Sequence, residues 1–289
     1  MVTRVTALGD LTWPQAQRLA AAGALLAVPV GSTEQHGPHL PLSTDTDVAA
    51  ALAARLAARR GDVVVAPPVG YGSSGEHAGF AGTISIGQQA LELMLLELGR
   101  GAAGTFGHIV FVCAHGGNRE PAGRAVARLR AESVDALLWM ADAALAGTSG
   151  AGLPRAGVPG SGRGRRQRLT RSIGIAMTLP TLRRNGRGPG GAGRPAAAAP
   201  DAHAGRAETA IQLALDPARV RVELAGPGNR TPAAELMPLL RAAGVRAASR
   251  NGVLGDPAGA CAAEGAALLE ALTAHLLAAV AGWRGPGPG

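Results

Sequence analysis

The densest group of side chains that could carry chemistry lies at 31–47. Glu34 and His36 are two residues apart, so on an extended segment both point to the same side and can reach one ion. Asp45, at the start of a predicted helix, can return to the same place. Carboxylate and imidazole ligands without a thiolate suit Zn²⁺, Mn²⁺ or Fe²⁺. The segment therefore predicts a metal site, and a solvated polar loop is the alternative.

A second group is centred on His115, which follows an apolar stretch at 108–114. Gly116 and Gly117 come next. Because they lack a Cβ, they let the backbone approach closely without a steric clash. The alternative for His115 is a hydrogen-bonded core residue. Cys113, within the apolar stretch, is predicted to be a small core side chain rather than a nucleophile.

The third group, at 201–209, contains His203 and Glu208. If both belong to one helix, they are about 500° apart in rotation, so they need not share a target. Each could then serve a different role at one site. A capped helix start with surface charges is the alternative.

Strands and helices must bring these three groups together. Apolar runs that alternate with helical periods are typical of an α/β fold with a mostly parallel sheet and helices on both faces. In such sheets the site forms at the carboxyl ends of the strands. Strands are predicted at 24–30, 62–67, 108–114, 134–140 and 220–224, and helices at 45–59, 88–101, 120–131, 203–215, 233–243 and 263–281.

The charge of the chain is concentrated in one segment. The 289 residues carry 28 basic and 20 acidic side chains, a formal net charge of +8. Ten of the arginines and no acidic residue fall within 147–200, so the rest of the chain has 18 basic against 20 acidic residues, a balance of −2. The segment is rich in Gly and Pro and has no aromatic residue for base stacking. It is predicted to be a flexible insertion, and a polyanion-binding role is the alternative.

Cysteine usage and hydropathy favour a soluble cytoplasmic protein. Cys113 and Cys261 are too few for a disulfide framework. The first residues lack the apolar run of a signal peptide, and no continuous apolar stretch reaches the length of a membrane span.

The segments that hold the three groups resemble the creatininase (creatinine amidohydrolase) family. The resemblance covers roughly 5–145 and 201–283 and implies a three-layer α/β/α fold, with 1–146 and 201–283 forming a single catalytic domain. An Arg/Gly/Pro-rich flexible insertion at 147–200 and a disordered tail at 284–289 would lie outside it. The motifs that carry the resemblance are PVGSTEQHGPHLPLSTDTD from Pro29, YGSSGEHAGFAGTIS from Tyr71, AHGGN from Ala114 and HAGRAET from His203.

The resemblance implies a homo-oligomeric amide hydrolase with two divalent ions, Zn, Fe or Mn. His203 would stand beside the metals as a proton donor or substrate contact. Asp47 and His39 are expected to support or cap neighbouring groups rather than to bind metal. Position by position, the implied ligands are Glu34 and His115 for one ion, His36 and Glu208 for the other, and Asp45 between them, with Glu76, His77, Gly116 and Gly117 lining the substrate pocket.

The stretch from Ala225 is most similar to the mycofactocin-system branch of that family. That likeness implies a peptidase whose substrate is a modified precursor peptide and whose product derives from its C-terminal Val-Tyr. Hydrolysis of a small cyclic amide is a second hypothesis, because it would use the same metal site. A third hypothesis, from a different class, is a non-catalytic polyanion-binding protein that acts through 147–200. Nucleic acid and membrane are not expected partners of the catalytic domain.

Overall fold

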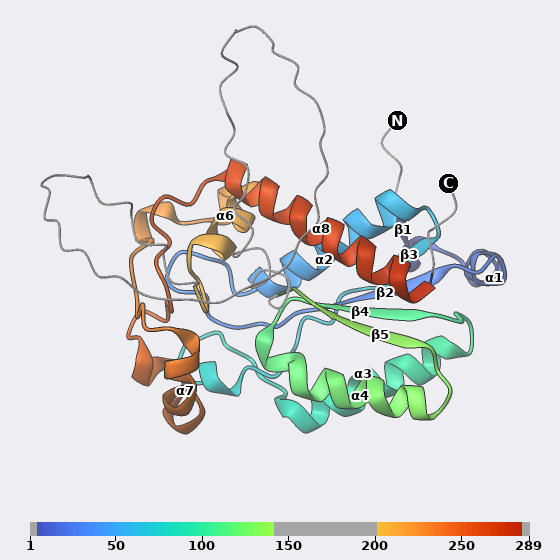
Figure 1. Cartoon of the computed structure of the whole chain (residues 1–289), viewed down its shortest axis with the longest axis horizontal. Coiled ribbons are helices and arrows are strands. Elements are labelled where there is room, and N and C mark those ends of the chain that lie inside the picture. The colour runs from blue at the N-terminus through green and yellow to red at the C-terminus, as the bar shows by residue number, and fades with distance from the viewer. Residues whose placement is uncertain (1–4, 142–200, 285–289) are drawn as a thin grey trace, which may run out of the picture. The chain divides into compact units, whose positions relative to one another are not determined.

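A five-stranded, entirely parallel sheet organises the molecule, in the order β1-β3-β2-β4-β5 (Figure 1). The computed structural model describes residues 5–141 and 201–284. The central strand β2 is buried at every position, as expected for an apolar strand with helices on both faces. The strands are β1 (Thr6–Ala7), β2 (Leu25–Val30), β3 (Val63–Val65), β4 (Ile109–Cys113) and β5 (Ala136–Met140).

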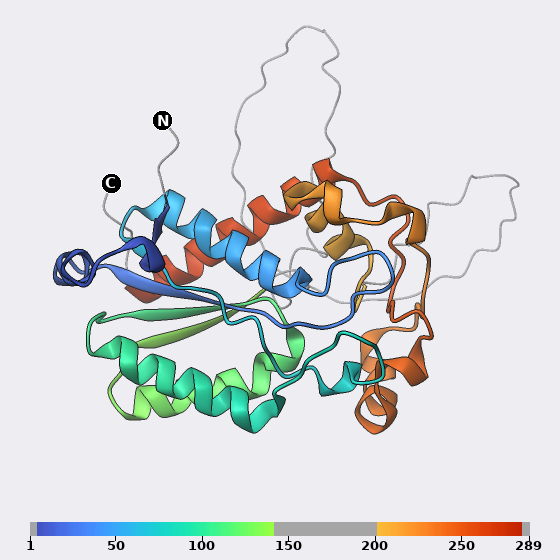
Figure 2. The same cartoon turned by 180° about the vertical axis from the view of Figure 1, so that it is seen from behind.

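Helices cover both faces of this sheet, so the fold has three layers (Figures 1 and 2). One apolar core joins the sheet to α2 (Thr44–Arg60), α6 (Arg206–Leu215) and α8 (Ala262–Arg284). A second core on the other face joins it to α3 (Gly87–Ala103) and α4 (Arg119–Ala131). The predicted α/β fold class and the mostly parallel sheet are therefore confirmed. The other helices are α1 (Trp13–Ala21) and α7 (Ala233–Ala248), with short 3-10 turns η1 (Leu8–Asp10), η2 (Gly75–His77), η3 (Gly116–Asn118), η4 (Pro217–Arg219) and η5 (Val222–Leu224).

The strand order places a topological switch point, where parallel α/β sheets have their crevice, at the carboxyl ends of β2 and β4. These strands are neighbours, but the chain leaves β2 toward β3 on one side and leaves β4 toward β5 on the other. At such a switch point the two following loops diverge, and ligands of parallel α/β sheets bind there. The loops after β2 and β4 contain the first and second predicted groups of site residues.

Helix α2 illustrates how the sequence sets the elements beside this crevice. Asp45 and Asp47 lie in its first turn and Arg59 and Arg60 in its last, which suits the helix dipole. Gly61 ends it in the left-handed conformation, with φ of 75°. Asp45 is thus held at the end of α2 that faces the crevice.

Two element predictions in the C-terminal half are wrong. The strand expected at 220–224 is absent from the sheet, and the 3-10 turn η5 lies there instead. The helix expected from 203 begins only at Arg206, since His203 pairs as an isolated bridge with Leu254 instead.

Among the described residues, α8 is the one helix long and apolar enough to cross a membrane by length and composition. Its inward face belongs to the core beside the sheet, where Leu269, Leu272 and Leu276 are fully buried. The described residues form part of one compact unit. The predicted insertion at 147–200 lies outside the described residues, as does the predicted tail apart from Arg284.

Candidate metal centre

Two strand-end loops and one helix start supply the first group of side chains. Glu34 follows β2, His115 follows β4, and Asp45 lies in the first turn of α2. Their ligand atoms lie within 4.8 Å of one another. His115 Nε2 is 3.3 Å from Glu34 Oε2, and His115 Nδ1 is 3.2 Å from Asp45 Oδ2. Because Val30 and Cys113 are paired in register, both loops leave the sheet at the same level.

A second group joins His36 to the C-terminal half of the chain. The ligand atoms of His36, His203 and Glu208 also lie within 4.8 Å of one another. His36 Nε2 is 3.2 Å from Asp45 Oδ1 and 4.0 Å from Glu208 Oε2. Since the other Asp45 oxygen faces His115, this carboxylate lies between the two groups. His203 precedes α6 rather than lying on it, so the helical rotation between His203 and Glu208 does not separate them.

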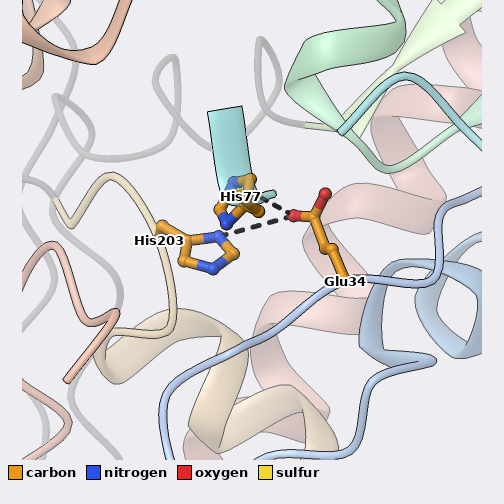
Figure 3. A group of neighbouring side chains, drawn as sticks. All are labelled: Glu34, His77 and His203. Atoms are coloured by element: carbon orange, nitrogen blue, oxygen red, sulfur yellow. Dashed lines mark ion pairs between the residues drawn. The ribbon is translucent and has the colours of Figure 1, made fainter. Parts of the chain in front are cut away.

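A third group surrounds Glu34 (Figure 3). Its Oε1 atom is 3.5 Å from His77 Nε2 and 3.8 Å from His203 Nδ1. His77 comes from η2 and His203 from the segment before α6, so three distant parts of the chain meet here. Both imidazoles and the carboxylate are buried.

The buried carboxylates and imidazoles shift one another's proton affinity. Burial raises the pKa of Glu34 to about 7. Burial opposes a positive charge on His36 and on His115, but neighbouring carboxylates outweigh it. Asp45 raises the pKa of His36 to about 10. Glu34 and Asp45 raise the pKa of His115 to about 10. Burial likewise opposes the charge of Asp45, yet His36 and His115 hold its pKa well below the usual range. The site therefore favours positive charge between its carboxylates.

The donor set fits divalent metal ions. Both oxygens of Glu34 are buried and accept no hydrogen bond from any described residue. A buried carboxylate without donors is costly unless a cation compensates it. Three carboxylates and several imidazoles converge within ligand distance of one another, and no thiolate is among them. This combination suits Zn²⁺, Mn²⁺ or Fe²⁺.

Two of the residues expected to contact substrate, Gly117 and Glu76, lie close to His115. A Cβ on Gly117 would lie 2.5 Å from His115 Nε2 and 2.8 Å from Glu76 Oε1, so glycine leaves room for both side chains. Glu76 is half-buried, and Gly116 is exposed. The close backbone approach predicted from the two glycines is thus realised at Gly117, where Ser73 O is also adjacent.

Asp47 and His39 point elsewhere. Asp47 accepts hydrogen bonds from Ser43 and Arg219 near the start of α2. His39 shares a hydrogen bond with the Thr209 hydroxyl, 2.9 Å from its Nε2. Burial, with the neighbouring His36, lowers the pKa of His39 to about 4. Neither residue joins a group of converging ligands among the described residues.

Three supporting residues were missed by the sequence analysis. Ser32 donates to Asp45 Oδ2 at 2.6 Å, and Asn118 ties Gly31 O to Ser73 N across the crevice. Gln35 contacts both His77 and His203. Their signal in the sequence was their place inside the two motifs, directly beside residues expected to bind metal. Residue type alone did not reveal which partners they hold.

Comparison with known proteins assigns the chain to a family. The creatininase family model, described as creatinine amidohydrolase, matches residues 9–280. Two solved structures are similar in fold: a mutant creatininase, with a TM-score of 0.69, and a creatininase described as "Mn", with a TM-score of 0.67. Each is 21% identical, and the match covers 96% of this chain and 98% of the other. The chain belongs to the creatininase family, and it is a hydrolase that acts on amide C–N bonds.

Within the family, the chain is similar to named peptidases over most of its length. A protein from Mycolicibacterium smegmatis named "Mycofactocin precursor peptide peptidase" is 42% identical over 246 residues, which cover 83% of this chain and 78% of the relative. A protein of the same name from Mycobacterium ulcerans is 38% identical over 99% of this chain and 95% of its own length. A creatinine amidohydrolase from Pseudomonas putida matches only 27% of this chain. The likeness to the peptidases therefore extends through the C-terminal half.

Proposed function

We propose that this protein is a metal-dependent peptidase that cleaves the modified mycofactocin precursor peptide and releases the part derived from its C-terminal Val-Tyr. The observation that carries the proposal is the likeness to the two named peptidases, which for the protein from Mycobacterium ulcerans covers 99% of this chain. Hydrolysis of a small cyclic amide would use the same centre, but the similarity to creatinine amidohydrolase covers a much shorter stretch.

Two divalent ions are proposed for the centre, with Asp45 between them. Glu34 and His115 would hold one ion, and His36 and Glu208 the other. This division is implied by the family resemblance, and two of the three groups of converging ligands are consistent with it. Zinc, iron and manganese all fit the donor types. Ions held here would polarise the scissile carbonyl and lower the pKa of water.

The residues of the chain supply the remaining roles. His203 is buried beside Glu34 and His36, where it can move a proton between water and the departing amine. His77 and Glu76, together with the backbone at Gly116 and Gly117, are proposed to line the substrate pocket. Burial of His77 and His203 excludes bulk water from the proton path.

The domain boundaries, the cellular location and the oligomeric state are also proposals. We assign 1–146 and 201–283 to one catalytic domain, 147–200 to a flexible insertion and 284–289 to a tail, in a cytoplasmic homo-oligomer. The ten arginines within 147–200 account for the basic charge, and every proposed site residue lies outside that segment.

The proposal is tested by incubating metal-loaded protein with the modified precursor peptide and following product by mass spectrometry. Release of the Val-Tyr-derived fragment is expected with at least one of Zn²⁺, Mn²⁺ and Fe²⁺, and Glu34→Ala is expected to abolish it. Thr12→Ala is a surface control, because Thr12 is exposed and its hydroxyl donates to Gln15 at the start of α1. No release with any of the three metals contradicts the peptidase assignment, and turnover of creatinine instead would favour the cyclic-amide alternative.

Deleting 150–198 separates the enzyme from the polyanion-binding alternative. The enzyme proposal expects unchanged metal content, because all ligands lie elsewhere in the chain. The alternative expects nucleic-acid binding that weakens steeply with salt and disappears on deletion. Filter binding at two salt concentrations and metal analysis of both proteins decide between them.

A further inference from the structure

The carboxamide of Gln35 is buried among the imidazoles of the centre, and its orientation is fixed by two backbone groups. Its Oε1 accepts from Gly37 N at 2.9 Å, and its Nε2 donates to Gly252 O at 3.2 Å. A backbone N–H can only donate and a backbone carbonyl can only accept. The carboxamide therefore has one possible orientation, with its NH₂ group toward the histidines.

This orientation determines which nitrogen of His77 carries the proton. Gln35 Nε2 lies 2.8 Å from His77 Nδ1. Since Nε2 of Gln35 is a donor, His77 Nδ1 must accept. An imidazolium ring carries protons on both nitrogens, so a ring whose Nδ1 accepts a hydrogen bond is neutral. Its single proton is then on Nε2, which faces Glu34 Oε1 at 3.5 Å (Figure 3).

The main chain of the same residue determines the state of His203. His203 Nε2 lies 2.7 Å from the backbone oxygen of Gln35, so Nε2 must donate. The 3.1 Å approach between Gln35 Nε2 and His203 Nε2 then joins two donors and is a contact rather than a hydrogen bond. In the other tautomer, the lone pair of His203 Nε2 would face the lone pairs of the Gln35 backbone oxygen at 2.7 Å. That repulsion is stronger than the one between the two donors at 3.1 Å. Nδ1 of His203 keeps its lone pair and faces Glu34 Oε1 at 3.8 Å.

We propose that Gln35 is a positioning residue that gives two neighbouring imidazoles opposite roles: His77 presents an N–H to the centre, and His203 presents a lone pair. His203 is thereby ready to accept a proton or to bind a metal, whereas His77 can only donate. The inference deepens the proposed function and rests on it for the effect on turnover. The tautomers themselves follow from contacts within the chain.

Gly252 supports this arrangement from the C-terminal half. A Cβ at this position would lie 1.9 Å from Gln35 Oε1, and the backbone has φ of +78°. Glycine is required for both reasons. The segment that contains Gly252 thus leaves space for the Gln35 carboxamide and also accepts its hydrogen bond.

The test is two-bond ¹H–¹⁵N NMR of protein labelled with ¹⁵N-histidine, both metal-free and loaded with zinc. Signals are assigned from spectra of His77→Asn and His203→Asn. We expect His77 and His203 to show the Nε2–H tautomer. In Gln35→Met, His77 should lose its single tautomer, while His203 should keep Nε2–H because its acceptor is the main chain. An Nδ1–H tautomer of His77 in the unaltered protein, or an unchanged His77 pattern in Gln35→Met, overturns the proposal.

A matched control is Gln212→Met. Gln212 is also buried, but its Nε2 donates to Thr44 O, and it has no hydrogen bond to an imidazole among the described residues. Its substitution should leave the His77 and His203 patterns unchanged. If Gln35→Met does not fold, Gln35→Glu serves instead, because an acceptor at this position should move the His77 proton to Nδ1.

Turnover provides the second readout. Gln35→Met should lower kcat about 10–100-fold at unchanged metal content, the range found for residues that orient metal-site groups. If kcat is unchanged although the His77 tautomer is lost, the division of roles is wrong. If the unaltered protein releases no product, the proposed function fails, and the NMR result alone decides the inference on Gln35.

Discussion

The centre has two sides that are built in different ways. On the strand-end side, Glu34, His36, Asp45 and His115 have side chains exposed by at most 6%. On the C-terminal side, the His203 side chain is 9% exposed and that of Glu208 is 26% exposed. The first side follows β2 and β4 directly, whereas the second has no strand beneath it among the described residues.

Local hydrogen bonds replace the sheet on the C-terminal side. His203 exchanges two backbone hydrogen bonds with Leu254, of 3.1 and 2.8 Å. Asp201 accepts from Arg206 N and, at 3.1 Å, from Asp256 N, so it holds the start of α6 against the segment after Leu254. Four of the five proposed metal ligands lie on the strand-end side and one, Glu208, lies on the other. We therefore expect the strand-end side to dominate metal binding and the C-terminal side to tolerate change at a smaller cost.

The largest effect should come from Asp45→Ala. This carboxylate faces His36 and His115 with separate oxygens, each at 3.2 Å, so its loss should remove both ions and all turnover. Removing one partner of a buried ion pair also costs about 3–5 kcal/mol of unfolding free energy. Mass-spectrometric metal analysis and urea titration measure the two effects. Retention of two ions would show that the strand-end side does not determine metal binding.

An intermediate effect is expected from pH. In metal-free protein the pKa of His36 and of His115 is about 10, above the ordinary 6.5 of histidine. Their protonation therefore stabilises the folded state fully below pH 6.5, and this contribution is lost as pH rises through 10. Glu34, with a pKa of about 7 against 4.5, acts in the same direction at lower pH. The Tm of metal-free protein should therefore fall between about pH 7 and about pH 10.

Metal-loaded protein is the control for the pH experiment. Ions bound as proposed would replace the protons of His36 and His115, so the Tm of loaded protein should vary much less over the same range. Equal slopes in the two forms would mean that these imidazoles are not the groups that metal displaces.

The smallest effect should come from Asp201→Ala, which acts only on the C-terminal side. Losing its two backbone contacts should cost about 1 kcal/mol, as at a helix cap, and should lower kcat through His203 and Glu208. The ion held by Glu34, Asp45 and His115 should remain. Asp216→Ala is the control, because the Asp216 side chain accepts from Ala218 N in η4 and, among the described residues, has no hydrogen bond or ion pair to a proposed ligand. Loss of both ions in Asp201→Ala would make the two sides one unit.

Much of the strand-end side could be predicted from the sequence. Long apolar runs fixed β2 and β4, and in a parallel sheet their carboxyl ends share one edge, which brings Glu34 and His115 together. The C-terminal side was harder, because alternation at 220–224 predicted a strand where the structure has η5. His203 also lies before α6, in a bridge with Leu254 that no local pattern signals.

The sequence by itself determined the chemical types in the centre and the family to which the chain belongs. Only the tertiary structure decided how they face one another. Asp45 lies between two imidazoles because α2 begins at the crevice, and Gln35 orients His77 and His203 because η2 and the segment around Gly252 meet there. Hydrogen-bond direction depends on which donors and acceptors touch, and those contacts join residues far apart in the chain.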